Sequence, residues 1–266
     1  MVIIVYHQLF LFIIKYIMNK NDYLKLGIGS SMSLSEGLIF GNFFESLKIM
    51  KQNGVSYRNG FNSLYSRSGL YSLLYTGYFP WGAIQSVGKG LPVFYTSYTI
   101  KEYMKKREYN NNQISIVAGF GGGISQGIFV APLQRMKTLA INNQQLSING
   151  GIREWFRGTT LTCSRRSLDW VLRFYFSDKL NQKIDNPIVS AFIAGSISAL
   201  TLPIDVLIVR TQSSEKQKLN EIIRNMIKNE GLKSFTNGLT MRIIHAGWHT
   251  AWIIGVGDIL YRKLKE

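Results

Sequence analysis

The strongest constraint on this chain is a pattern that occurs three times at a nearly constant interval. In each copy an aromatic residue shortly precedes a glycine, and Gly77, Gly158 and Gly238 lie 81 and 80 residues apart. A repeat of this period indicates one packing unit used three times. We therefore predict an N-terminal extension over residues 1–23 and repeats over 24–107, 108–184 and 185–266.

Each repeat contains two long apolar runs. A helix that crosses a bilayer core needs roughly 20 such residues, and these runs also carry Gly, Ser and Thr, which suits helices that face a water-filled cavity. The fold predicted is an all-α membrane protein with six transmembrane helices in three pseudo-threefold repeats around a central cavity. Short amphipathic helices are expected within the repeats. The runs cover 26–47, 79–100, 113–134, 158–177, 187–209 and 238–261.

The composition limits the possible partners. The net charge of +16 favours an anionic partner, but the basic residues are not gathered with aromatics and no nucleic-acid-binding module is visible, so nucleic acid is not expected. Small anionic solutes and anionic lipid fit better. A single cysteine excludes an internal disulfide and a Cys/His zinc site. No nucleophile–base or paired-carboxylate arrangement indicates an enzyme, and no cofactor is expected.

Small residues and prolines mark the first helix of each repeat. Small residues recur every fourth position, a spacing that lets another backbone approach closely. Pro132 and Pro203 are expected to interrupt their helices. The second repeat has lost about eight residues between its two helices, which predicts a truncated surface helix there. We interpret Met18 as the start of translation, with residues 1–17 as either an untranslated extension or a disordered tail.

A second motif precedes each glycine. The full pattern is proline, any residue, acid, two residues, base, and each copy departs from it at one position, at Phe43, Gln134 and Ile208. The third copy is followed by Gly231-Leu232 and the aromatic-glycine pattern. Three copies in register, over about residues 24–264, resemble the mitochondrial carrier family. The resemblance implies a multi-pass protein of the mitochondrial inner membrane that exchanges solutes as an antiporter and acts as a monomer. The copies begin at Phe43, Pro132 and Pro203.

The resemblance also implies a ring of ion pairs that closes the cavity on the matrix side. Glu45 would pair with Lys137, and Asp205 with Lys48. The third pair would join Gln134 to Ile208, and neither is charged. Both halves of one pair are thus missing together, which avoids a buried charge without a partner. We predict a matrix gate with two ion pairs, formed by Glu45, Lys48, Lys137 and Asp205.

Charged residues within the second helix of each repeat indicate the substrate site, because ionisable groups at membrane depth are usually functional. Gln85 and Lys89 are one turn apart, and Asp169 follows Arg165 at i+4, which suits an ion pair. A narrower resemblance, to family members that carry citrate and oxoglutarate, implies contacts at Val93 as well. The predicted substrate-binding residues are Gln85, Lys89, Val93, Arg165, Arg166, Arg242 and His245.

Several alternatives stay open. His245 and His249 are spaced i, i+4, but no third ligand is evident, so no metal is expected. Basic groups from three helices suit a multiply charged anion, and we predict exchange of di- and tricarboxylates such as citrate and 2-oxoglutarate. A nucleotide or phosphate-ester carrier is the second reading. A degenerate carrier fold that acts as a membrane scaffold is the third.

Overall fold

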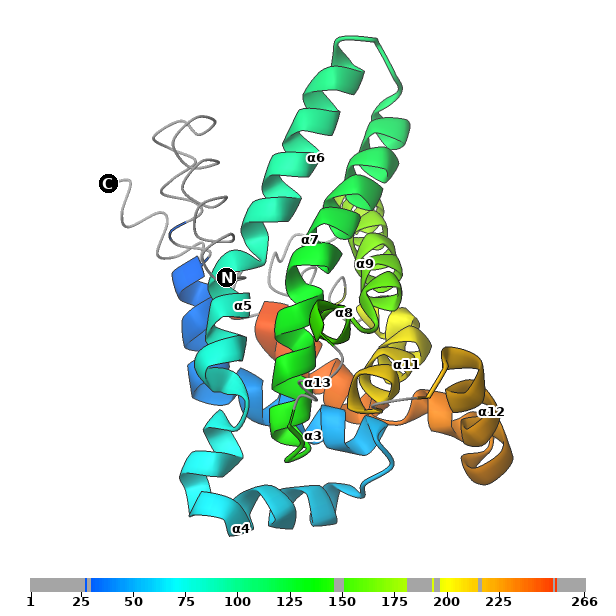
Figure 1. Cartoon of the computed structure of the whole chain (residues 1–266). Helices are drawn as coiled ribbons and strands as arrows, with labels where there is room; N and C mark the ends of the chain where they lie inside the picture. Colours follow the sequence, from blue (N-terminus) through cyan, green and yellow to red (C-terminus); the bar gives the residue numbers. More distant parts are fainter. Residues whose placement is uncertain are drawn as a thin grey trace.

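The computed structural model describes residues 27, 30–145, 151–180, 193, 197–214, 217–250 and 252. Within these residues every regular element is helical and no strand occurs (Figure 1). The predicted extension over residues 1–23 lies outside them. The elements are η1 (Gly37–Gly41), α3 (Asn42–Gln52), α4 (Tyr57–Tyr75), η2 (Tyr78–Gly82), α5 (Ala83–Gly88), α6 (Gly90–Lys105), α7 (Asn111–Ile141), α8 (Gly151–Trp155), α9 (Thr159–Leu180), η4 (Ser198–Thr201), α11 (Leu202–Ser213), α12 (Leu219–Glu230), η5 (Leu232–Thr236) and α13 (Leu239–Thr250).

Helix α7 organises the bundle. It packs against α6 and α9, which flank it in Figure 1, and in the described part of the chain it alone is long and apolar enough to cross a membrane by length and composition. Glycines allow the close approach to α9. A Cβ at Gly123 would lie 2.3 Å from the Cα of Ser167, and one at Gly127 would lie 2.6 Å from the Cα of Cys163. The small-residue pattern therefore corresponds to close backbone packing here.

The two prolines take different positions. Pro132 lies inside α7, which continues through it. Pro203 is instead within the first turn of α11, directly after the 3₁₀ segment η4. A proline in a first turn costs little, because its missing N–H would have no acceptor within the helix. At Pro203 the helix thus changes from 3₁₀ to α geometry. Kinks of the helix axis at Pro132 and Pro203 stay predictions.

The repeated glycines share one backbone conformation. Gly77, Gly158 and Gly238 have φ values of 71°, 82° and 88°, in the left-handed region that glycine adopts without steric cost. Each also lies against the first long helix of another repeat, with a side chain or carbonyl 2.9 to 3.4 Å from an ideal Cβ. The equal spacing in the sequence thus reflects three turns with the same backbone requirement, while the repeat boundaries stay predictions. These neighbours are Lys137, Gln212 and Gln52, respectively.

The ends of α3, α7 and α11 are each capped by an arginine. Arg210 Nε donates to the carbonyl of Gln52 at 2.6 Å, Arg67 to the end of α7 at 2.9 Å, and Arg157 Nε to the end of α11 at 3.0 Å. The last carbonyls of a helix lack partners within the helix and favour a nearby cation. Each contact joins a helix end to an arginine that is far from it in the sequence.

The surface helices between the long helices differ in length. Helix α4 has 19 residues but is interrupted by non-helical backbone at Ser68 and Gly69, α12 has 12, and the described part of α8 has five. The truncated helix expected from the shortened connection stays a prediction, because residues 146–150 lie outside the described residues. Buried apolar side chains of α3, α4, α7 and α11 form one core cluster, and α11 and α12 form another. Together these clusters fix α11 between its neighbours, with Asp205 facing α3.

Candidate functional site

A polar cavity lies between α3, α5, α7, α9 and α13. It encloses about 800 Å³, counted out to its open mouth. Its described lining contains six Lys or Arg side chains but only three Asp or Glu side chains. The predicted substrate-binding residues that line it are Gln85, Lys89, Arg165, Arg166, Arg242 and His245.

Val93 is the predicted residue that the structure does not bring to the cavity. It is 4% exposed and lies in α6, where its Cγ1 is 3.3 Å from an ideal Cβ on Gly122 of α7. The helix that carries Gln85 is divided at Lys89 into α5 and α6. Even in a regular helix, eight residues turn the side chain by about 80°. Val93 therefore packs between helices.

The structure contains both expected ion pairs. Lys137 Nζ lies 2.5 Å from Glu45 Oε2, and Lys48 Nζ lies 3.2 Å from Asp205 Oδ2. The first joins α7 to α3, and the second joins α3 to α11. Lys48, Lys137 and Asp205 are buried, and Glu45 is partly buried. Their role as a matrix gate stays a prediction.

The third interface, between α7 and α11, holds uncharged residues at the corresponding positions. Gln134 is 5% exposed and lines the cavity, and its Oε1 is buried without a hydrogen-bond partner among the described residues. Ile208 is fully buried. A single charge at either position would lack the opposite charge that the other two interfaces provide. The joint absence of both charges at this interface therefore avoids the cost of a buried charge without a partner.

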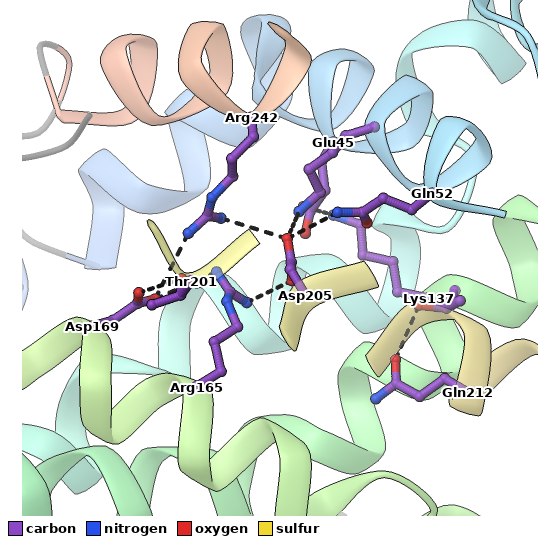
Figure 2. Close-up of polar contacts among 11 residues, drawn as sticks. Glu45, Gln52, Lys137, Arg165, Asp169, Thr201, Asp205, Gln212 and Arg242 are labelled. Atoms are coloured by element: carbon purple, nitrogen blue, oxygen red, sulfur yellow. Dashed lines mark hydrogen bonds and ion pairs between the residues drawn. The ribbon is translucent and has the colours of Figure 1, made fainter. Parts of the chain in front are cut away.

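Asp205 is the centre of a wider charge network (Figure 2). Besides Lys48, its carboxylate lies 3.0 Å from Arg165 and 3.9 Å from Arg242. It also accepts a hydrogen bond of 3.2 Å from Gln52 Nε2. One fully buried acid thus contacts a base of the predicted gate and two arginines of the predicted substrate site. Nothing in the spacing of the sequence indicated this link.

Asp169 of α9 contacts the same two arginines. The i+4 ion pair with Arg165 is confirmed at 3.4 Å, and Arg242 lies 3.7 Å away. Thr201 Oγ1 donates a hydrogen bond of 2.8 Å to the other oxygen. Arg165 and Arg242 therefore bridge two buried carboxylates, one on α9 and one on α11 (Figure 2).

Arg166 has a different environment. It lines the cavity beside Arg165, yet among the residues that the structure places, no carboxylate lies within ion-pair distance of it. Its Nε is buried without a hydrogen-bond partner in the same set of residues. Buried polar groups normally have partners, so an unpartnered Nε in a cavity lining is unusual.

Glu36 is a site residue that the sequence reasoning did not select. It is 4% exposed and lines the cavity. Its carboxylate lies 3.6 Å from His245 Nε2 and 3.2 Å from His249 Nδ1. In the part of the chain with described coordinates, no set of three or more His, Cys, Asp or Glu side chains could hold a metal ion. The useful signal was an acid inside an otherwise apolar run.

Comparison with known proteins finds similarity to the family that the motifs resemble. Residues 184–266 match the family model described as mitochondrial carrier protein. The chain is 24% identical over 278 aligned residues, or 87% of both chains, to the citrate/oxoglutarate carrier protein of Saccharomyces cerevisiae. It is 25% identical to tricarboxylate transport protein A of Danio rerio over 50% of this chain and 46% of that protein.

A relative with a different solute also matches. The mitochondrial glycine transporter of Vanderwaltozyma polyspora is 22% identical over 57% of this chain and 60% of its own length. The matches thus extend to proteins named for other solutes. They agree on the kind of protein, a carrier, more closely than on what is carried.

Proposed function

Since the family match and the similarity to carriers support membership in the mitochondrial carrier family, we propose that this chain spans the mitochondrial inner membrane several times and exchanges small anions. The anions are di- and tricarboxylates such as citrate and 2-oxoglutarate. The six apolar runs supply the spans, arranged in three repeats. The protein is a transporter rather than an enzyme.

The observation that carries this proposal is the charge of the cavity. Six basic side chains and three acidic ones line its described surface. Burying unpaired charge is costly, so a solute of opposite charge is favoured there. Arginine binds carboxylates through two parallel hydrogen bonds. We assign the solute contacts to Gln85, Lys89, Arg165, Arg166, Arg242 and His245.

The shared contacts of Asp205 suggest how binding would open the gate. A carboxylate that binds Arg165 and Arg242 competes with Asp205 for these guanidinium groups. Asp205 then keeps fewer of the contacts that hold it next to Lys48. A ligand shifts a conformational equilibrium only through different affinities for the two states. In this mechanism the difference comes from arginine contacts that the closed state uses internally.

Exchange in liposomes tests the proposal. Purified protein is reconstituted with an internal anion, and uptake of labelled citrate or 2-oxoglutarate is measured for the parent chain and for Arg166→Gln. We expect uptake that requires an internal carboxylate and falls at least roughly tenfold in the variant, because a charge-assisted hydrogen bond is lost. The matched control is Arg153→Gln, which removes an arginine outside the cavity lining.

The set of solutes tested distinguishes a carboxylate carrier from a carrier of other solutes and from a membrane scaffold. It includes glycine, nucleotides and phosphate esters beside the carboxylates. Exchange of glycine or of nucleotides alone would refute the carboxylate assignment while retaining a carrier. Folded protein that exchanges none of these solutes would contradict transport and favour a scaffold.

A further inference from the structure

We propose that Asn53, Asn142 and Ser213 form an uncharged latch that holds α3, α7 and α11 together and replaces the ion pair missing between α7 and α11. The proposal rests on the proposed function, because a latch matters only in a chain whose cavity opens and closes. It assigns a positioning role to three residues outside the charged gate.

The latch residues lie at the ends of the three helices. Asn53 and Asn142 are the residues that follow α3 and α7, and Ser213 is the last residue of α11. Each lies eight positions after the motif's acid position, occupied by Glu45, Gln134 and Asp205. The three helices therefore contribute equivalent positions, one layer beyond the ion pairs.

Ser213 joins the other two residues through its hydroxyl group. Asn53 Nδ2 donates to Ser213 Oγ at 2.9 Å, and Asn142 Nδ2 donates to the same oxygen at 3.1 Å. Ser213 Oγ donates to the carbonyl of Val209 at 2.8 Å. A hydroxyl group offers one donor and two acceptor positions, so all are used. This oxygen is the point at which all three helices meet.

The amide of Asn142 is fixed in the same way. Its Nδ2 donates to the carbonyl of Thr138 at 2.9 Å as well as to Ser213. Both of its hydrogens are thus used. The bond to Thr138 lies within the same helix end and orients the side chain, while the bond to Ser213 crosses to α11. This geometry is that of a preorganised contact.

The interface between α7 and α11 carries a second neutral bond. Thr138 Oγ1 donates to Gln212 Oε1 at 3.2 Å, and both residues are buried. This interface is the one where Gln134 and Ile208 replace the charged pair. Neutral hydrogen bonds therefore lie where the ionic contact is absent, and Ser213 extends them to α3.

The latch also lies between two hollows. The cavity described above is bounded by Glu45, Lys48, Gln134 and Lys137. A second polar hollow, lined by Asn53, Asn142 and Ser213, opens beyond the helix ends. Among the residues with described positions, none lines both hollows. The ion pairs and then the latch are the layers that separate them.

Cysteine accessibility tests the latch without any transported solute. Cys163, the chain's one cysteine, is replaced by serine, and Ser86→Cys places a reporter in the cavity lining. A membrane-impermeant maleimide is added to vesicles whose latch side faces outward. We expect Ser213→Ala to raise the labelling rate roughly tenfold, because two hydrogen bonds between helices are lost. Asn142→Leu is expected to act in the same direction.

Two further variants make the result specific. Ser214→Ala is the matched control, since the Ser214 hydroxyl contacts Thr211 and Arg157 but neither asparagine. Its labelling should stay within about twofold of the parent, as for most surface substitutions. Adding Gln134→Glu and Ile208→Lys to Ser213→Ala should restore an ion pair and slow labelling again.

Equal labelling of the Ser213→Ala and Ser214→Ala variants would overturn the latch. Faster labelling that the restored ion pair does not slow would refute the idea that the latch replaces that pair. If labelling responds as expected but no anion is exchanged, the proposed function fails and the latch stands. If anions are exchanged and labelling does not respond, the latch alone fails.

Discussion

Asp205→Asn is the sharpest test of the buried charge network. Asp205 is fully buried, and its carboxylate contacts Lys48 at 3.2 Å and Arg165 at 3.0 Å. The substitution keeps the size of the side chain and removes its charge. Arg165 would still have Asp169 at 3.4 Å, whereas Lys48 would lose the carboxylate next to it. The main cost is therefore a buried ammonium group without its ion-pair partner.

The magnitude follows from burial. Removing one partner of a buried ion pair costs about 3–5 kcal/mol. In a chain of this size each kcal/mol lowers the unfolding temperature by about 2 °C, so we expect a decrease of roughly 6–10 °C. The assay is thermal unfolding in detergent, followed by the fluorescence of the five tryptophans.

The matched control is the surface pair of Arg210 and Glu230. These side chains are 2.8 Å apart but are 18% and 33% exposed. An exposed pair contributes about 1 kcal/mol or less, so Glu230→Gln should lower the unfolding temperature by no more than about 2 °C. Adding Lys48→Met to Asp205→Asn should recover part of the loss, because the unpaired ammonium group is removed. Equal shifts for Asp205→Asn and Glu230→Gln would refute the reasoning.

Two glycine predictions test the packing in the same assay. Gly123→Ala should lower the unfolding temperature by several degrees, because its Cβ would lie 2.3 Å from the Cα of Ser167. Gly90→Ala is the control and should be neutral or stabilising, because nothing lies within 4 Å of its Cβ. Equal effects of the two substitutions would contradict the α7–α9 packing. Gly77→Ala should also be destabilising, because φ is +71° and a Cβ would lie 2.9 Å from the carbonyl oxygen of Lys137. An unchanged unfolding temperature for that variant would disprove the strained turn.

The sequence predicted those contacts that depend on spacing or on a repeated motif. The i+4 pair of Arg165 and Asp169 follows from helical geometry alone. The pairs Glu45–Lys137 and Lys48–Asp205 connect distant residues, and they could be predicted only because the resemblance supplied the pairing rule. Helical structure followed from the apolar runs.

Other features depend on how helices rotate and where they break. The narrower resemblance implied Val93 as a solute contact, but its packing against Gly122 of α7 places it between helices. The contacts of Arg242 with Asp205 and of Glu36 with His249 join helices with no fixed spacing in the sequence. Such contacts come from tertiary packing, which a single sequence does not specify.

The surplus of positive charge in the cavity also affects whether a solute is exchanged for another or moved alone in one direction. Asp169 and Asp205 hold Arg165 and Arg242, while Arg166 has no carboxylate within ion-pair distance among the described residues. A carrier that closes around an empty cavity must enclose this surplus, which is costly in a medium of low dielectric constant. A bound anion neutralises the charge and removes that cost. Under the proposed function, the transition between open states would therefore be easier for the loaded protein than for the empty one, and this difference would favour exchange of anions. Since more of the surplus would be neutralised as the solute gains negative charge, the proposed function predicts faster exchange of di- and tricarboxylates than of monocarboxylates.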